Sequence, residues 1–231
     1  MGSIVTFTFI IAIIFCVLLV LWAIPRFKIN VDRLDYVTLY FGPPGCGKTT
    51  FLAKISSQLQ RKNTDVFSNV PIDGCYAYSR SDIGKFSFPE NSILLFDEGS
   101  LNGYDNRDHK DNFKGNHAME YFKLIRHYKN KIIFSNQGWD ELDKKIRTLT
   151  VQLWYVRSFG PFSYAMRIFK SVDVDEDSKQ IVDGYVLPSK FKLIFCPSYT
   201  QIVYRPKYYR YFDSYSRPEL PEMEKTLYDF E

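Results

Sequence analysis

A glycine-rich segment between an apolar run and an amphipathic segment limits what this chain can fold into more than any other feature. The apolar run, residues 37–41, is β-branched and aromatic and predicts a buried strand. Directly after it the chain reads GPPGCGKT, which fits the spacing G-x-x-x-x-G-K-[ST] without a gap. Leu52, Ile55 and Leu59 then recur at helical spacing. The order of strand, glycine-rich loop and helix predicts a phosphate-binding loop.

Each residue type in this loop suits the binding of a phosphate chain. Glycines let the backbone curl so that consecutive N–H groups point at one anion, and the following helix adds the positive end of its dipole. Lys48 is expected to reach the β- and γ-phosphates, and the Thr49 hydroxyl to ligate Mg²⁺. The alternative, a Gly/Pro turn that happens to precede a lysine, is disfavoured by both flanks. We therefore expect ATP and Mg²⁺ here, with nucleotide contacts from Gly42, Pro43, Pro44, Gly45, Cys46, Gly47, Lys48, Thr49 and Thr50.

An acidic pair follows a second apolar run. Residues 92–96, SILLF, predict a fully buried strand that ends in Asp97 and Glu98. Asp97 is expected to hold Mg²⁺ together with Thr49, and Glu98 to orient or deprotonate the attacking water. The alternative is a strand that simply ends in two solvated acids. The phosphate-binding loop earlier in the chain favours the functional interpretation.

A glutamine follows a third apolar run, residues 131–135. In a parallel sheet, ligands gather at the carboxyl ends of the strands, so Gln137 is expected near Glu98 and the γ-phosphate. There it would bind the lytic water through a hydrogen bond. An ordinary amide at a strand end remains the alternative.

The sequence supplies no obvious arginine for the γ-phosphate within the same subunit. Arg126 is therefore expected to complete a neighbouring subunit's site in a homo-oligomer, and Arg147 and Arg157 are alternatives for this role. A solvated charge is the commoner role of such arginines. The expected catalytic set is Lys48, Glu98, Gln137 and Arg126.

Residues 4–24 form an uninterrupted apolar run without a charged side chain. As a helix this run spans about 31 Å, which matches a hydrocarbon core of about 30 Å. A signal peptide is the alternative. It would have a basic start, a shorter apolar core and a small-residue cleavage site, and this run has none of the three. Arg26, Lys28 and Arg33 follow the run at once. By the positive-inside rule we expect a single-pass protein of the cytoplasmic (inner) membrane, with its N-terminus outside and the remainder in the cytoplasm.

The rest of the chain suggests one medium-sized domain with appendages. The formal charge of +4 permits contact with nucleic acid or anionic lipid without arguing for either, and four scattered cysteines suggest neither a disulfide framework nor a zinc site. Residues 181–186 and 191–195 are candidate strands, and the Tyr/Arg segment 204–217 is expected to pack on the core rather than to stack bases. We divide the chain into a transmembrane anchor (1–25), a linker (26–35), a P-loop ATPase domain (36–157) and a β-rich C-terminal module (158–231).

Several of these motifs together resemble the zonula occludens toxin-like family, which includes the gene I morphogenesis ATPases of filamentous phages. The resemblance covers roughly residues 36–157 and continues more weakly to the end. Family members commonly carry the membrane helix after the ATPase domain, whereas here the apolar run comes first. The matching pieces are GPPGCGKTT at 42–50, SNVPI at 68–72, ILLFDEGS at 93–100, Arg126-His127, IIFSNQ at 132–137, ELDKKIR at 141–147 and FDSY at 212–215.

The resemblance implies a RecA-like ATPase anchored in the host membrane that energises virion assembly and extrusion. Its expected partners are further copies of itself, phage coat and assembly proteins and membrane lipid, with single-stranded DNA as a further candidate. The expected fold is a three-layer α/β P-loop NTPase with a parallel sheet, an N-terminal transmembrane helix and a C-terminal β-rich module. Two alternatives stay open: a nucleotide-gated membrane scaffold with negligible turnover, and a DNA-packaging motor of another virus type.

Overall fold

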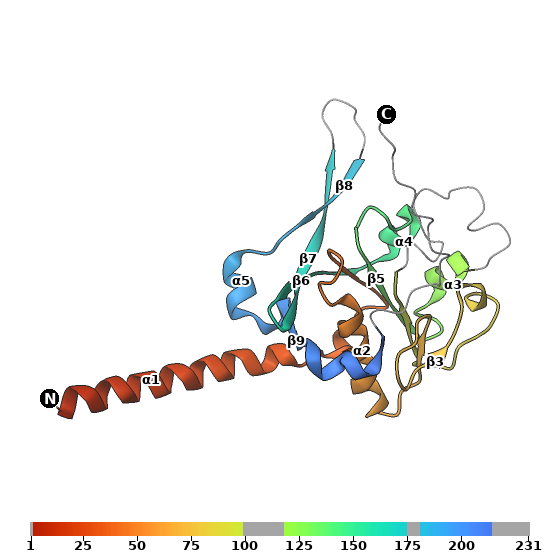
Figure 1. Cartoon of the computed structure of the whole chain (residues 1–231). Coiled ribbons are helices and arrows are strands. Elements are labelled where there is room, and N and C mark those ends of the chain that lie inside the picture. The colour runs from red at the N-terminus through yellow and green to blue at the C-terminus, as the bar shows by residue number, and fades with distance from the viewer. Residues whose placement is uncertain (1, 99–117, 175–180, 214–231) are drawn as a thin grey trace, which may run out of the picture.

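A single mixed sheet forms the centre of the molecule (Figure 1). The computed structural model describes residues 2–98, 118–174 and 181–213. Within these residues the sheet has nine strands in the order β3-β2-β4-β5-β1-β6-β7-β8, and β9 pairs with β7. The strands are β1 (Val37–Phe41), β2 (Val66–Ser68), β3 (Tyr76–Ala77), β4 (Ile93–Phe96), β5 (Lys131–Asn136), β6 (Gln152–Phe159), β7 (Phe162–Val174), β8 (Ile181–Val186) and β9 (Thr200–Tyr204).

The first six strands of the sheet, from β3 to β6, are parallel. β5 lies between β1 and β4, with Leu39 opposite Phe134 and Phe134 opposite Phe96. The predicted parallel sheet is therefore confirmed. The α-helices are α1 (Gly2–Ala23), α2 (Lys48–Gln60), α3 (Ala118–Leu124), α4 (Lys144–Leu149) and α5 (Lys190–Phe195).

Alternating side chains of the parallel strands build a separate hydrophobic core on each face of the sheet. In β1, Tyr40 packs with α2 on one face, whereas Leu39 packs with α3 and α4 on the other. Both side chains are fully buried. Because successive residues of a strand point to opposite faces, this alternation yields the predicted three layers of helix, sheet and helix.

Antiparallel strands extend the sheet beyond β6. β7 pairs with β6, and β8 and β9 each pair with β7. The boundary drawn between residues 157 and 158 falls inside β6, so the β-rich C-terminal segment continues the sheet of the preceding residues.

One of the two candidate strands near the C-terminus is wrong. Residues 181–186 form β8 as expected, but residues 191–195 belong to the helix α5. The Ser189 side chain caps this helix by accepting a hydrogen bond from the Lys192 amide. Phe191 and Phe195 lie one helical turn apart with ring centroids 4.5 Å from each other. Capping and the i,i+4 pair favour the helix over the strand.

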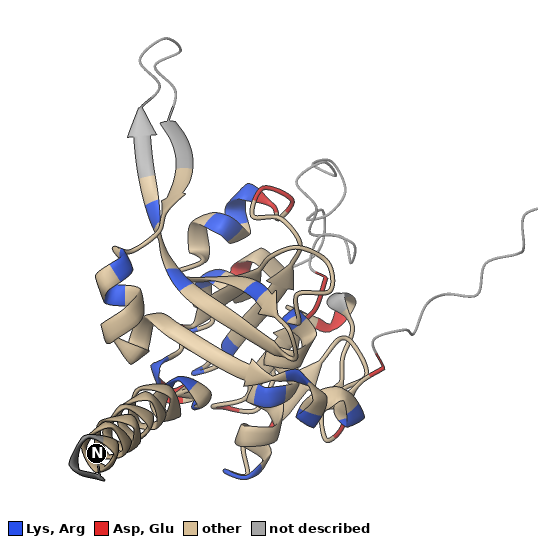
Figure 2. Cartoon of the chain, turned by 60° about the vertical axis from the view of Figure 1, so that its left-hand side comes forward, with Lys and Arg blue, Asp and Glu red and all other residues tan. Residues whose placement is uncertain are grey.

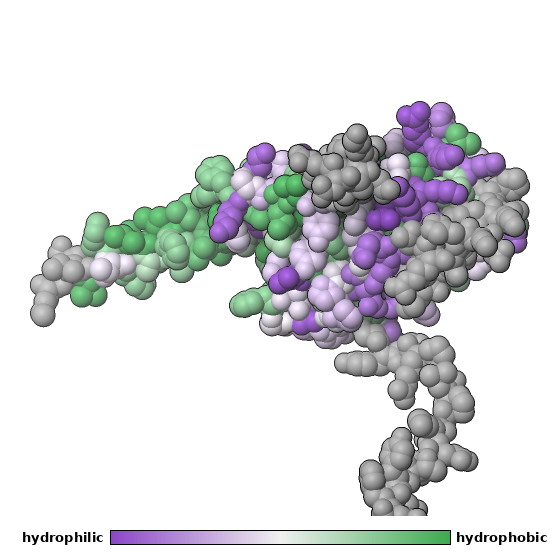
Figure 3. Space-filling view, turned by 90° about the horizontal axis from the view of Figure 1, so that it is seen from above, coloured by the Kyte–Doolittle hydropathy of each residue, from purple (hydrophilic) through white to green (hydrophobic). Residues whose placement is uncertain are grey.

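The helix α1 projects away from the body, and its side chains from residue 5 to residue 22 are exposed (Figures 1 and 3). It is long and apolar enough to cross a membrane, and none of its apolar window is buried against the protein. The linker that follows does pack against the body, because Ile29, Val31 and Leu34 are each 4% exposed.

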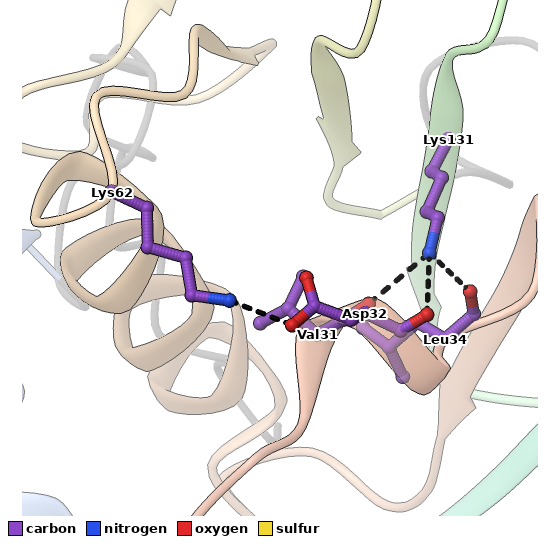
Figure 4. Close-up of polar contacts among 5 residues, drawn as sticks. All are labelled: Val31, Asp32, Leu34, Lys62 and Lys131. Carbon is purple, nitrogen blue, oxygen red and sulfur yellow. Dashed lines mark hydrogen bonds and ion pairs between the residues drawn. The ribbon is translucent and has the colours of Figure 1, made fainter.

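A lysine of β5 holds this linker in place (Figure 4). Lys131 Nζ donates to the carbonyl oxygens of Val31 at 3.2 Å, Asp32 at 3.1 Å and Leu34 at 2.6 Å. The Asp32 carboxylate accepts from Lys62 Nζ, in the turn after α2, at 2.8 Å, and both of these side chains are exposed. The base of α1 is thus joined to the sheet by polar contacts as well as by apolar packing.

The two lysines make a matched test of this linkage. Lys131→Met removes three hydrogen bonds from a charged donor and is expected to lower the free energy of unfolding by about 2 kcal/mol. Lys62→Met removes one exposed ion pair and is expected to cost less than about 1 kcal/mol. Thermal unfolding of the detergent-solubilised protein, followed by near-UV circular dichroism, measures both. Equal losses would show that the Lys131 contacts do not hold the linker.

Candidate active site

The phosphate-binding loop, residues 42–47, lies between β1 and α2 as predicted. Gly47 is the N-cap of α2 and has a φ of 93°, in the left-handed region that favours glycine. A Cβ atom on Gly47 would lie 2.2 Å from Ser163 Oγ of β7, and this hydroxyl donates to the Cys46 carbonyl at 2.6 Å. The loop therefore packs so closely against β7 that no side chain fits at position 47.

The Lys48 side chain lies across this loop. It is 8% exposed, and its ammonium donates to the carbonyl oxygens of Gly42 at 2.8 Å and Pro43 at 3.1 Å. Lys48 also lines a cavity of about 570 Å³ that opens beside the start of α2. The Lys48 ammonium therefore lies where it can contact an anion that is bound at the loop and extends into the cavity.

Asp97 occupies the carboxyl end of β4 and contacts the start of α2. The Thr49 hydroxyl donates to Asp97 Oδ2 at 2.6 Å, and Asp97 is 5% exposed. Asn69, which follows β2, fixes the backbone of Asp97: its amide donates to the Asp97 carbonyl at 3.0 Å, and its Oδ1 accepts from the Asp97 N–H at 2.7 Å. Sequence reasoning assigned Asn69 no role, although it lies at a strand end within the SNVPI segment.

Glu98 and Gln137 enter the same cavity from neighbouring strands. Both line it, Glu98 after β4 and Gln137 after β5. Glu98 has a φ of 51°, which costs a residue with a Cβ atom about 1 kcal/mol. Such a conformation persists where the surrounding structure imposes it, and functional sites are a common place for it. The structure thus brings Lys48, Thr49, Asp97, Glu98 and Gln137 together.

The oxygen atoms at this site fit Mg²⁺. The Thr49 hydroxyl and the Asp97 carboxylate already lie within one hydrogen bond of each other. Mg²⁺ prefers one or two protein oxygen ligands, with water and substrate phosphates for the remainder. Among the described residues no group of three or more His, Cys, Asp or Glu side chains is arranged to hold a metal by itself. The site therefore suits a metal ion that arrives with a nucleotide.

The three arginines singled out from the sequence do not line this cavity. Arg126 is exposed in the turn before β5, at the amino ends of the parallel strands and hence at the opposite edge from the phosphate-binding loop. Arg147 lies 5.7 Å from the ring centroid of Trp139. Arg157 is exposed and donates to the Tyr155 hydroxyl at 3.0 Å. A role for any of them in a neighbouring subunit stays a prediction.

An arginine of the same subunit does reach the cavity, contrary to the expectation from the sequence. Arg205 lines the cavity, and its guanidinium donates to the Gly45 carbonyl at 3.3 Å and to the Gly160 carbonyl. Its place beside the loop follows from the antiparallel pairing of β9 with β7. No local sequence pattern indicates that pairing, and sequence reasoning therefore missed Arg205.

The described part of the Tyr/Arg segment packs on the body, as expected, and also forms one wall of the cavity. Its residues Arg205–Tyr211 form a 3₁₀ helix in which Tyr208 is buried against the core that contains α2. Tyr209, Phe212 and Asp213 line the cavity, and residues 214–217 lie outside the described part of the chain.

A buried lysine of α2, Lys54, contacts the strand that precedes this wall of the cavity. Lys54 Nζ donates to the Ile202 carbonyl of β9 at 2.9 Å. Burial, with a smaller contribution from the Lys207 charge, lowers the pKa of Lys54 to about 7. The helix that begins at the phosphate-binding loop is thus hydrogen-bonded to β9, the strand directly before Arg205.

A viral protein is similar in sequence to part of this chain. No family model matches the chain. The uncharacterized protein ORF2 of Spiroplasma virus SpV1-C74 is 25% identical over 144 residues, a match that covers 56% of this chain and 42% of that protein. The match thus spans less than half the length of this curated relative.

Two solved structures are similar to a large part of the chain. The N-terminal domain of zonular occludens toxin from Neisseria meningitidis is 18% identical, covers 70% of this chain and 99% of that chain, and has a TM-score of 0.46. The genome packaging NTPase B204 from Sulfolobus turreted icosahedral virus 2, in complex with ATP-gammaS, is 10% identical, covers 67% and 98%, and has a TM-score of 0.42. A zonular occludens toxin domain is thus among the folds that this chain resembles. These likenesses concern the fold, and the function is argued from the geometry of the site.

Two glycines of the loop offer a matched test of this geometry. Gly45 and Gly47 both have positive φ, but a Cβ atom on Gly45 meets nothing within 4 Å whereas one on Gly47 meets Ser163. Gly45→Ala therefore adds backbone strain of about 1–2 kcal/mol alone. We expect Gly47→Ala to weaken ATP binding at least about tenfold more than Gly45→Ala does, because the clash adds to the strain. Titration with a fluorescent ATP analogue measures both, and equal affinities would contradict the packing of the loop on β7.

Proposed function

We propose that this protein is an ATPase that hydrolyses MgATP in the cavity beside α2. The observation that carries the proposal is the convergence of Lys48, the Thr49–Asp97 pair and Glu98 on one cavity. A cation for the phosphates, oxygen ligands for a metal and a carboxylate for the lytic water are the parts that phosphoryl transfer to water requires. Nucleotide binding without hydrolysis would need no carboxylate at the position of Glu98.

The residues divide the work of the reaction. Lys48 and the N–H groups at the start of α2 bind the β- and γ-phosphates and hold them in line for attack. Thr49 and Asp97 would hold Mg²⁺, which supplies positive charge against the phosphate oxygens. Glu98 accepts the proton of the attacking water as a general base, and Gln137 orients that water by a hydrogen bond. Arg205 approaches the phosphates from the C-terminal wall of the cavity.

We propose further that α1 anchors this ATPase in a membrane. The exposed apolar surface of α1 has no partner in the described part of the chain, and basic residues follow it directly (Figures 2 and 3). A bilayer covers such a surface, and the positive-inside rule places Arg26, Lys28, Arg33 and the body on the cytoplasmic side of the host inner membrane.

The biological role that fits best is to energise the assembly and extrusion of filamentous phage particles. The sequence motifs resemble those of the phage morphogenesis ATPases, and the curated relative is a viral protein. An ATPase anchored in the membrane by α1 would lie where a particle leaves the cell. The partners that this role calls for are further copies of the chain, coat and assembly proteins, membrane lipid and single-stranded DNA.

Substitutions at the acidic pair and the lysine test hydrolysis directly. Lys48→Ala is expected to weaken nucleotide binding and to abolish turnover, because Lys48 contacts phosphates in the ground and transition states alike. Glu98→Gln is expected to bind MgATP at least as tightly as wild type and to turn over about 10²–10⁴-fold more slowly. Asp97→Asn should lose Mg²⁺-dependent affinity. Phosphate release and nucleotide titration measure the three variants, and wild-type turnover by Glu98→Gln would leave a scaffold without a lytic step.

The position of Arg205 predicts how inactive variants complement each other. Arg205→Ala is expected to lower turnover at least about tenfold, since an arginine at the transferring phosphate stabilises the transition state. Because Arg205 and Lys48 serve the cavity of their own subunit, a mixture of Arg205→Ala and Lys48→Ala proteins contains no complete site and should show no turnover beyond that of the Arg205→Ala protein alone. If Arg126 acts across subunits, the mixture of Arg126→Ala with Lys48→Ala regains activity. Recovery in the Arg205 mixture would show that Arg205 also acts in a neighbouring subunit.

A further inference from the structure

The end of α1 is fastened to α5. The Trp22 indole and the Arg26 guanidinium both donate to the Ile194 carbonyl, and the guanidinium lies 3.9 Å from the ring centroid of Trp22. Arg26 is 1% exposed. Figure 1 shows α1 and α5 on the same side of the body. A membrane that surrounds α1 therefore meets the body at α5.

The helix α5 presents apolar side chains to the outside. Phe191, Ile194 and Phe195 are 66%, 49% and 61% exposed, and no residue of α5 is buried. Lys190 and Lys192 lie in the same helix. Exposed aromatic and aliphatic residues interspersed with lysines are typical of a helix that lies in the interface of a bilayer.

A cavity of about 270 Å³ lies between the linker, the strands β6, β7 and β9 and the turn after α5. Pro25 and Lys28 line it from the linker, and Pro197 and Ser198 line it from the turn after α5. The charged residues of its lining are Lys28, Arg33 and Arg167, and no acidic side chain is among the lining residues. Within the described residues none of these three cations forms an ion pair. The cavity is therefore positively charged.

Trp154 of β6 also lines the cavity and is 2% exposed, so its ring forms a buried part of the cavity wall. The polar recognition therefore comes from the three cations. Cationic side chains of this kind suit the oxygen atoms of a phosphate group.

We propose that this cavity binds the headgroup phosphate of an anionic phospholipid in the leaflet on the side of the body. The inference rests on the proposed anchoring of α1 in a membrane. Pro25 and Lys28 follow α1 directly, so the cavity lies at the depth of the headgroups when α1 spans the bilayer. Basic pockets at this depth recognise anionic headgroups. Pro197 and Ser198, which line the cavity, follow α5 in the chain, so the exposed apolar side chains of α5 are available to the acyl chains of the bound lipid.

The same charges would attract the phosphates of a nucleic acid, but the surroundings favour lipid. Nucleic-acid surfaces are polar and extended, with basic residues along a groove. Here two lining residues, Pro25 and Pro197, follow closely after the apolar helices α1 and α5. Continuity with the membrane helix decides for lipid.

The thermal midpoint of the full-length protein in neutral detergent provides the test. Dihexanoyl-phosphatidylglycerol is expected to raise the midpoint in a saturable way, whereas dihexanoyl-phosphatidylcholine is not, because the second lipid has no net charge. Arg167→Gln should lose the shift and Arg167→Lys should keep part of it. Lys129→Gln, which changes an exposed lysine paired with Glu90, is the matched control and should keep all of it. The phosphate-binding loop is intact in every variant, so the difference between variants reports on this cavity.

Other ligands and a membrane assay separate the remaining outcomes. A similar shift with phosphatidylcholine, or one that Arg167→Gln retains, overturns the proposal. If inorganic phosphate alone produces the Arg167-dependent shift, the cavity is a site for a free anion; if a single-stranded oligonucleotide produces it more strongly than the lipid, the site serves nucleic acid. Extraction of membranes at alkaline pH tests the anchor independently. Release of the wild-type protein would refute the proposed anchoring. The thermal shift in detergent would still report on lipid binding separately.

Discussion

The parallel hydrogen bonding of β5 between β1 and β4 is the constraint on which the candidate site depends. It places the carboxyl ends of three strands side by side, so the phosphate-binding loop, the acidic pair and Gln137 face one cavity. Apolar side chains on both faces hold this register, because a slip of one residue would exchange the two cores. The chemistry of the site is therefore a consequence of strand order.

One short stretch, residues 194–205, contacts both the end of α1 and the phosphate-binding loop. The Ile194 carbonyl accepts from the Trp22 indole of α1, the Ile202 carbonyl accepts from Lys54 of α2, and Arg205 donates to the Gly45 carbonyl of the loop. The three contacts come from one segment that contains α5 and β9. The base of α1 and the candidate site are therefore packed against the same part of the chain.

Much of the fold was predictable because buried parallel strands leave continuous apolar runs. The strands at 37–41, 93–96 and 131–136 were predicted within one residue, since both faces of each are covered by helices. The sequence predicts a strand where α5 forms, because the segment is short and its apolar residues fit an exposed strand as well as an exposed helix. Its cap at Ser189 and the contact between Phe191 and Phe195 decide for the helix.

By itself the sequence determined the phosphate-binding loop, the acidic pair and the glutamine, because each is a local pattern of strand, turn and polar side chain. It equally determined the membrane-length helix, which depends on composition alone. The tertiary structure decided that Asn69 fixes Asp97, that Arg205 serves the cavity of its own subunit, and that three cations gather at the base of α1. These contacts join residues far apart in the chain through strand pairing, and no local pattern encodes which distant strands pair.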